Sequence, residues 1–190
     1  YDNEQRFNDG GDVRVIVITD TNFSIKYVLG LLNSRLLNWY YGFIGKPKGN
    51  SREYFNEPLA KIPIAKPRKA FEDKIIKAVE SIILLKAEHE NIQTSFSTLL
   101  LSKFDIEKLS RKLLSWHELT FKQFLTELKK KKVKLSLNEE AEWMEYFNEQ
   151  KAKAEELKSQ IAQTDDEIDA MVYELYGLTG EEVRVVDGGV

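Results

Sequence analysis

Two long apolar stripes dominate the chain beyond Pro67 and constrain its fold more than any other feature. Between residues 70 and 95, and again between residues 137 and 163, apolar side chains recur every three or four positions, with Lys and Glu on the opposite face. The stripes are wider than the seam of a strict heptad repeat, which favours packing inside a globular helical domain over an exposed coiled coil. We therefore predict a long-helix bundle or a helical hairpin.

Helix-start signals divide the second half of the chain further. Capping boxes, in which a Ser or Thr and a Glu three residues later satisfy each other's backbone amides, occur at residues 136–139, 164–167 and 179–182. They predict three separate helices, the first stopping before the second box and the second ending at Gly177. Three shorter elements are expected between the two stripes: helices over 106–114 and 121–132, and a strand over 133–135.

The part of the chain before the first stripe has a mixed character. Residues 13–19 are β-branched and predict a strand, and residues 62–64 are held extended by prolines and predict an edge strand. Between them, apolar residues at helical spacing predict a helix over about 25–43, with Gly42 and Gly45 as its candidate stops.

The predicted fold class is therefore α+β and predominantly α-helical. A small N-terminal β/α domain over residues 1–66 is followed by a helical domain over residues 67–190, with the boundary near residue 67. A chain of 190 residues has room for one domain of ordinary size or for two small ones, and it is long enough for a real core.

Composition excludes several classes of protein. The chain has no cysteine, which excludes disulfides, thiolate metal sites and a cysteine nucleophile, and which is compatible with a cytoplasmic location. No stretch approaches the roughly 18 uncharged apolar residues of a membrane span, and no signal peptide opens the chain. Because Tyr1 rather than methionine comes first, we expect a fragment or a processed product. The expected protein is cytoplasmic and has no membrane partner.

Charge is distributed unevenly along the chain. Residues 26–69 carry nine Lys or Arg against two acids, whereas residues 139–190 carry fifteen acids against four bases. This asymmetry indicates one end that faces a polyanion and another that is solvated and acidic. Chance clustering on a helical protein is the alternative.

A basic loop over residues 45–69 carries the strongest functional signal. Its lysines and arginines have the charge that neutralises phosphates, and its Asn, Ser, Arg and Tyr side chains have the donors, acceptors and ring faces that base edges or sugars require. A solvated loop whose lysines maintain solubility is the alternative. The candidate DNA-binding residues are Lys46, Lys48, Asn50, Ser51, Arg52, Tyr54, Lys61, Lys66, Arg68 and Lys69.

A second basic run, residues 129–132 with Lys122 and Lys134, occurs in the helical part. At a helix C-terminus such lysines complement the helix dipole, which is the favoured explanation, and phosphate contact is the other.

No arrangement of residues indicates an active site. The Glu-x-Lys triplets at 72–74, 127–129 and 149–151 fall on predicted helix faces rather than on the adjacent strands that a metal-dependent nuclease needs. His89 and His117 lack a ligand-spaced partner, and no nucleophile elbow, phosphate-binding loop or dinucleotide fingerprint is present. We predict no catalytic residue, no metal ligand and no cofactor within the chain.

Several short motifs resemble one family. Residues 29–34, the aromatic run 39–41 and residues 62–64 resemble the target-recognition region of type IIG restriction-modification enzymes, which end in a TaqI-like C-terminal specificity domain. Five later stretches resemble the tail of the same family: residues 102–109, 116–119, 134–137, 140–143 and 167–179. The last of these also occurs in related adenine methyltransferases and specificity subunits. The resemblance covers about residues 25–187.

The resemblance implies a parent polypeptide that binds a short double-stranded DNA sequence, methylates an adenine from S-adenosylmethionine and cleaves the DNA with Mg²⁺. The Asn-Pro-Pro-Tyr-type methyltransferase motif is absent, so the methyltransferase and nuclease domains are expected upstream, together with most base-reading loops. The chain would fix the register of the duplex through phosphates, so that a base can be flipped into a distant catalytic pocket. The rival interpretation is a helical protein-interaction or dimerisation module without DNA contact.

Overall fold

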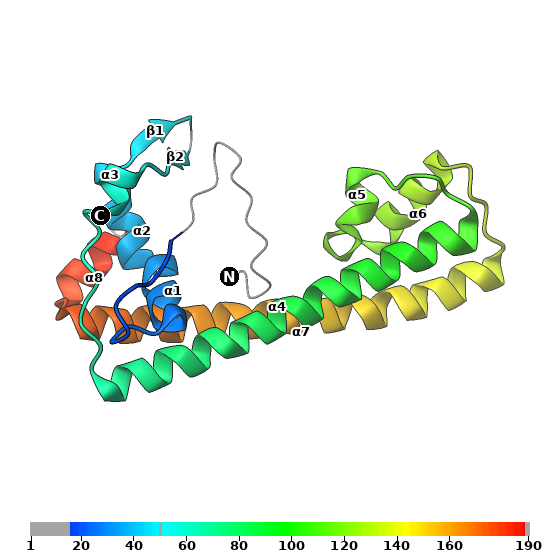
Figure 1. Ribbon diagram of the computed structural model, residues 1–190. Helices are drawn as coiled ribbons and strands as arrows, with labels where there is room; N and C mark the ends of the chain where they lie inside the picture. The colour runs from blue at the N-terminus through cyan, green and yellow to red at the C-terminus, as the bar shows by residue number, and fades with distance from the viewer. Residues whose placement is uncertain (1–15, 50, 189–190) are drawn as a thin grey trace. The chain divides into compact units, whose positions relative to one another are not determined.

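The computed structural model describes residues 16–49 and 51–188 and confirms a predominantly α-helical α+β fold (Figure 1). In that part of the chain the only sheet is a two-stranded hairpin. None of the helices there is long and apolar enough to cross a membrane. In chain order the elements are α1 (Ile25–Asn33), α2 (Arg35–Ile44), β1 (Lys46–Lys48), β2 (Ser51–Glu53), α3 (Asn56–Leu59), α4 (Lys69–Phe104), α5 (Arg111–Leu114), the 3₁₀ helix η1 (Trp116–Glu118), α6 (Phe121–Lys130), α7 (Leu137–Tyr176) and α8 (Gly180–Val186).

The chain forms two compact units. The terminal unit combines the chain up to Ser81 with the chain from Thr164 onward, and the central unit comprises Ile82–Gln163. Helices α4 and α7 each contribute one part to the terminal unit and the other part to the central unit. The domain boundary near residue 67 was predicted from the change in sequence character there, and it stays a prediction.

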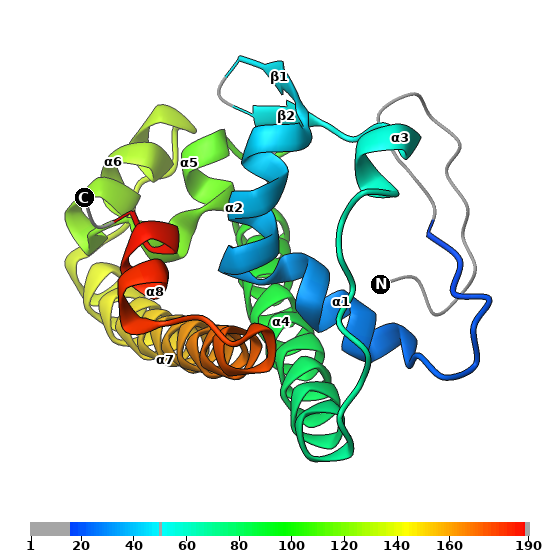
Figure 2. The same cartoon turned by 90° about the vertical axis from the view of Figure 1, so that its left-hand side faces the viewer.

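Within the terminal unit, α1 packs closely against α4 (Figures 1 and 2). The approach is so close that a Cβ atom on Gly30 would lie 2.6 Å from Ile75 Cγ2 and 3.0 Å from Val79 Cγ2. An ion pair of 2.6 Å between Lys26 and Glu80 closes the edge of the same contact. Because Gly30 has no side chain, the backbone of α1 can lie directly against the Ile75 and Val79 side chains of α4.

The helix predicted over residues 25–43 is in fact two helices, α1 and α2, which Ser34 separates. The backbone of Ser34 is extended, at ψ 152°, and its amide donates to Leu31 O at 3.1 Å. Its hydroxyl oxygen accepts from the Leu37 amide at 3.3 Å, so that one residue ends α1 and caps α2. Gly45 ends α2, as predicted.

The predicted edge strand over residues 62–64 is wrong, because the backbone there bonds to side chains instead of to another strand. The Tyr176 hydroxyl of α7 donates to Pro63 O at 2.6 Å and accepts from the Ala65 amide at 3.1 Å. The Tyr27 hydroxyl of α1 donates to Ala65 O at 3.1 Å. Two tyrosines thus satisfy backbone groups that a sheet would otherwise satisfy.

The strand predicted over residues 13–19 is wrong for residues 16–19, which are irregular, and residues 13–15 lie outside the described part of the chain. A strand needs a neighbour for its backbone groups, and the described residues pair no strand with this segment. The observed hairpin lies inside the predicted basic loop, where Lys46 pairs with Glu53 across β1 and β2. Gly49, at φ 59°, supplies the left-handed conformation of its turn.

The central unit is built around Phe96, which is fully buried on α4. Its ring stacks on that of Trp116 with centroids 3.8 Å apart, and the rings of Phe124 and Phe147 lie 5.9 Å and 6.1 Å away. Within this unit the parts of α4 and α7 run side by side, and α5, η1 and α6 cover them (Figure 1). Within the central unit, the apolar faces of α4 and α7 therefore point into one shared core.

Two of the predicted connecting elements are wrong. The helix predicted over residues 106–114 is reduced to the four residues of α5, because the chain turns at Asp105 with a φ of 50°. Residues 133–135 form no strand, since Lys132 also adopts a positive φ, of 64°, and the Val133 amide donates back to Leu128 O at 3.1 Å. The segment after α4 stays irregular until Ser110 caps α5, and the segment after α6 closes the end of that helix.

Helix α7 runs without interruption for 40 residues, so the capping box at residues 164–167 does not begin a new helix. The chain between Leu137 and Tyr176 contains no glycine or proline, and the helix continues through the local signal. The first box is confirmed, since Ser136 Oγ lies 2.7 Å from Glu139 Oε2. The third box is confirmed at the start of α8, and Gly177, at φ 73°, ends α7 as predicted.

Candidate nucleic-acid interface

The β1–β2 hairpin is fixed to α2 by aromatic and polar contacts. Tyr41 is buried on α2, and its hydroxyl donates to Glu53 O at 2.8 Å. Its ring stacks on Tyr54 with centroids 4.8 Å apart, and Arg52 Nε donates to Gly42 O at 3.1 Å. The hairpin is therefore a platform of defined orientation rather than a free loop.

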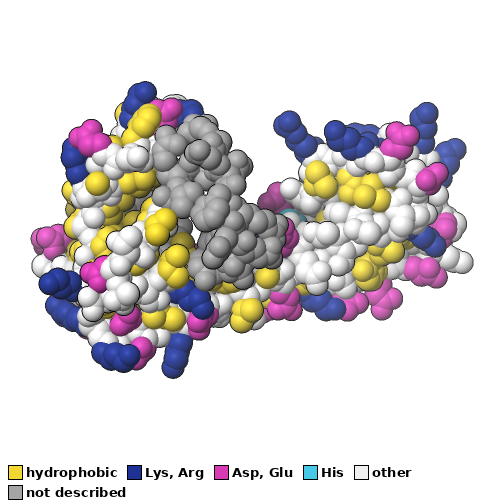
Figure 3. Space-filling view, in the orientation of Figure 1, with side chains coloured by type: hydrophobic (Ala, Val, Ile, Leu, Met, Phe, Trp, Pro, Cys, Tyr) yellow, Lys and Arg dark blue, Asp and Glu magenta, His cyan; other side chains and the backbone are white. Residues whose placement is uncertain are grey.

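Lys46 and Lys48 occupy the same face of β1, two positions apart, and both pair with Glu53 on β2. Their ammonium nitrogens lie 3.1 Å and 3.5 Å from the carboxylate oxygens, and the lysine side chains keep 66% and 50% of their surface exposed. The Lys46 ammonium also lies 5.4 Å from the ring centroid of Phe55. Figure 3 shows basic and acidic side chains together over this part of the terminal unit.

The two lysines favour the ionised form of the Glu53 carboxyl. The hydrogen bond from Lys46 lowers the pKa of the Glu53 carboxyl, with a smaller contribution from the charge of Lys48, so the carboxylate stays ionised at neutral pH. The hairpin thus presents two exposed cations that share one internal anion.

The remaining candidate DNA-binding residues occupy different settings. Lys61 pairs with Glu57 at 2.6 Å, and Lys69 pairs with Asp73 at 3.5 Å. Tyr54 is half exposed beside Tyr41, while Arg52 is turned toward the α2 backbone. Lys66 and Arg68 are exposed between α3 and α4. Asn50 lies outside the described residues, and Ser51 is described by its backbone alone.

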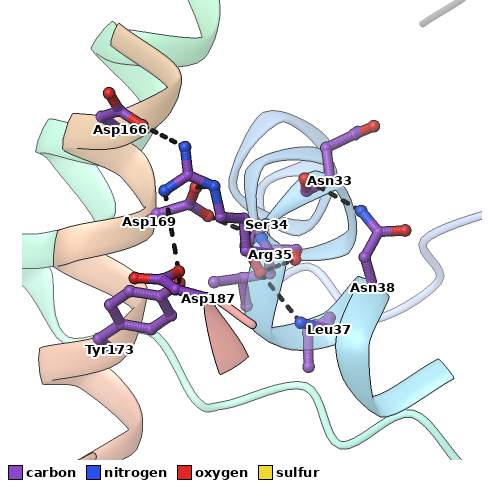
Figure 4. Close-up of polar contacts among 10 residues, drawn as sticks. Asn33, Ser34, Arg35, Leu37, Asn38, Asp166, Asp169, Tyr173 and Asp187 are labelled. Carbon is purple, nitrogen blue, oxygen red and sulfur yellow. Dashed lines mark hydrogen bonds and ion pairs between the residues drawn. The ribbon is translucent and has the colours of Figure 1, made fainter. Parts of the chain in front are cut away.

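Sequence reasoning missed a cluster of charges around Arg35, at the first position of α2 (Figure 4). The Arg35 amide donates to Asp169 Oδ1 at 2.7 Å, and its guanidinium Nε lies 3.2 Å from Asp169 Oδ2. The guanidinium also bonds to Asp166 and lies 3.8 Å from Asp187. The carboxylates come from α7 and from the end of α8, so no local pattern around Arg35 reveals them.

The electrostatics of this cluster are those of a partly buried ion network. Burial raises the pKa of the Asp169 carboxyl, while the Arg35 amide and guanidinium oppose that increase. The Tyr173 hydroxyl donates to Asp187 at 2.6 Å and ties the last carboxylate to α7. The cluster holds α2, the helix that carries the hairpin, against α7 within the terminal unit.

The structure also brings together the two histidines, which the sequence showed as isolated. The rings of His89 and His117 lie 5.3 Å apart, and Gln93 Nε2 is 3.3 Å from a nitrogen of each. Burial lowers the pKa of His117, and the nearby His89 adds to this effect. No group of three or more His, Cys, Asp or Glu among the described residues is arranged to hold a metal ion.

Two family models match different parts of the chain. Residues 1–64, which include α1, α2 and the hairpin, match the family model of the TaqI-like C-terminal specificity domain. This match supports a target-recognition region of a restriction-modification system.

A second match covers more than half of the chain and shows its family. Residues 68–172 match the model described as a domain of unknown function (DUF8810), and the chain belongs to that family. No curated protein and no solved structure matches the chain.

Proposed function

We propose that this chain is the DNA-contacting end of a target-recognition region, with its helical continuation, from a type IIG restriction-modification enzyme. It positions double-stranded DNA for adenine methylation and cleavage by domains upstream in the same polypeptide. The observation that carries the proposal is the β1–β2 hairpin, which presents two exposed lysines within the stretch that matches a specificity domain.

In the proposed mechanism the hairpin fixes the register of the duplex. Lys46 and Lys48 contact successive phosphates, and Tyr54 offers a hydroxyl and a ring face beside them. Because Tyr41 holds the hairpin to α2, a phosphate bound there is also placed relative to the rest of the terminal unit. Arg52 takes a positioning role, since its guanidinium bonds to the Gly42 carbonyl.

The chemistry belongs to the upstream domains in this proposal. They would bind S-adenosylmethionine and Mg²⁺, and this chain would supply neither a catalytic group nor a ligand to those cofactors. The setting is the bacterial or archaeal cytoplasm.

The rival function, a helical interaction or dimerisation module, has less support. The apolar stripes that would form such an interface are already buried within the two units. Ile75 and Val79 are buried in the terminal unit, and Ile82, Phe147 and Leu157 are buried in the central unit. The large exposed apolar side chains on α4 and α7, among them Leu84, Leu137 and Met144, do not form a continuous heptad seam.

Fluorescence-anisotropy titration with a mixed-sequence DNA duplex at two salt concentrations tests the proposal. The Lys46→Ala/Lys48→Ala variant should bind more weakly and should lower the slope of log K against log salt by about 2, because two phosphate contacts are lost. The matched control is Lys77→Ala/Lys153→Ala, which removes the same charge from helices α4 and α7. Equal affinities and equal slopes for the two variants would contradict a DNA surface on the hairpin.

A further inference from the structure

The central unit carries a second concentration of positive charge that the hairpin does not explain. Between residues 108 and 134, Lys and Arg exceed Asp and Glu by seven. Figure 3 shows Lys and Arg side chains gathered along one edge of the central unit, over α5 and α6. We call the nine basic residues the central basic surface: Lys108, Arg111, Lys112, Lys122, Lys129, Lys130, Lys131, Lys132 and Lys134.

The fold joins residues of this surface that are distant in sequence. Ser110, the N-cap of α5, donates its hydroxyl to Glu127 of α6 at 2.9 Å, so that Lys112 and the last turn of α6 lie near one carboxylate. Glu127 is buried and also pairs with Lys130 at 2.7 Å. The acid at the centre of the surface is therefore already engaged by Ser110 and Lys130.

The other eight basic side chains make no ion pair with a carboxylate in the part of the chain that the structure describes. In contrast, Lys46 and Lys48 of the hairpin share Glu53, and Lys61 and Lys69 each have an acidic partner. Unpaired like charges on a small helical unit repel one another, and a bound polyanion would relieve that repulsion.

Helix dipoles do not account for the arrangement. Lys129 and Lys130 lie in the last turn of α6, where a cation is favourable. Lys122 is the second residue of the same helix, where the dipole disfavours a positive charge. A surface selected only to complement helix ends would not place a cation at this position.

We propose that the central basic surface binds the phosphate backbone of double-stranded DNA, as a second contact separate from the hairpin. The exposed positions of α6 are polar throughout (Lys122, Gln123, Thr126, Lys129 and Lys130), so this helix offers no apolar face for insertion into a lipid surface. The contact neutralises phosphates without reading bases. It therefore adds affinity and salt dependence but no sequence preference.

The test compares two triple variants of the full chain that carry the same change in net charge. Lys112→Gln/Lys122→Gln/Lys129→Gln removes three cations of the surface and leaves the Lys130–Glu127 pair in place. Lys77→Gln/Lys86→Gln/Lys158→Gln removes three exposed cations from α4 and α7. Each is titrated against a mixed-sequence duplex over a range of salt, and against anionic phosphatidylserine vesicles. Circular dichroism checks that both variants fold.

The expected result is specific to the first triple variant. Its slope of log K against log salt should fall by about 2 to 3, and its affinity at low salt should drop by on the order of tenfold, while the control changes little. Equal effects of the two triples, no DNA binding by the intact chain at low salt, or an effect confined to vesicles would each overturn the proposal. If the first triple does not fold, Lys131→Gln/Lys132→Gln/Lys134→Gln, in the segment after α6, replaces it.

The hairpin variant separates this proposal from the proposed function. A loss of DNA affinity in the central triple, with no loss in Lys46→Ala/Lys48→Ala, would refute the hairpin as the DNA surface and support the central basic surface. The reverse pattern would leave the hairpin assignment standing and refute this one.

Discussion

Arg35 and Asp169 are joined twice, once through the Arg35 backbone amide at 2.7 Å and once through its guanidinium at 3.2 Å. They are 134 positions apart in the sequence. Because the amide belongs to the first turn of α2, the Asp169 carboxylate acts as a helix cap that a different helix supplies. The pair therefore couples the helix that carries the hairpin to the last part of α7.

Replacing Asp169 should destabilise the terminal unit. In Asp169→Ala the Arg35 amide loses its acceptor and a partly buried charge network loses its central anion, so the free energy of unfolding should fall by about 2–3 kcal/mol. Urea unfolding followed by circular dichroism measures the change. Asp165→Ala, one turn earlier on the exposed side of α7, is the control and should lie within about 0.5 kcal/mol of the unsubstituted chain. A similar loss in both variants would contradict a specific role for Asp169.

Gly30 offers a second test of packing in the terminal unit. A Cβ atom there would approach Ile75 Cγ2 to 2.6 Å, so Gly30→Ala should destabilise the chain by about 1–3 kcal/mol through overpacking. Gly42 lies in α2 with nothing within 4 Å of an added Cβ, and Gly42→Ala should instead stabilise by about 0.5–1 kcal/mol through helix propensity. Thermal unfolding of the two variants should therefore shift in opposite directions, and a shift of the same sign in both would be inconsistent with the close α1–α4 contact.

Glu127 should contribute stability that depends on pH. The hydrogen bond from Lys130, followed by that from Ser110, lowers its pKa below the ordinary value of 4.5. A carboxyl whose pKa is lower in the folded chain stabilises above its unfolded pKa, and that stabilisation disappears as the pH falls through the folded pKa. The difference in free energy of unfolding between the unsubstituted chain and Glu127→Gln should thus be largest near neutral pH and shrink at acidic pH. A difference that stays constant from neutral to acidic pH would contradict this assignment.

The Glu53 carboxylate should weaken DNA binding by the hairpin lysines. Glu53→Gln removes the anion that Lys46 and Lys48 share, so, on the proposed function, DNA binding should tighten by several-fold and its salt dependence should steepen. Glu149→Gln is matched in charge, since Glu149 pairs with Lys153 on α7 at 2.8 Å, and it should have a smaller effect. Anisotropy titration distinguishes the two variants, and an equal effect would mean that net charge alone controls binding. The hairpin should survive the change, because Tyr41 bonds to the Glu53 backbone rather than to its side chain.

Local signals predicted several elements correctly, because the residues that determine them are adjacent in sequence. Ser136 with Glu139 and Thr179 with Glu182 satisfy each other within one turn, and Gly177 alone can adopt its left-handed conformation without strain. The wide apolar stripes likewise identified the two long helices, since a helical face is a property of its own segment.

Non-local contacts account for what the sequence did not predict. The bond from the Arg35 amide, in the first turn of α2, to Asp169 joins residues that are far apart in the sequence. The irregular course of Pro63 to Ala65 depends on the Tyr176 hydroxyl. In the candidate interface, Lys46 was predicted as a phosphate ligand, but its pairing with Glu53 follows from the hairpin register, which composition does not encode.

The boundaries between the two units fall inside helices α4 and α7, at Ser81 and at Gln163, rather than in loops. Proteases cut most readily at exposed loop tips, where the backbone is free to extend, and a continuous helix offers no such site at either crossing. The central unit is therefore an insertion whose two ends are both helical. Any shortened protein that lacks it must replace part of two helices rather than trim a linker.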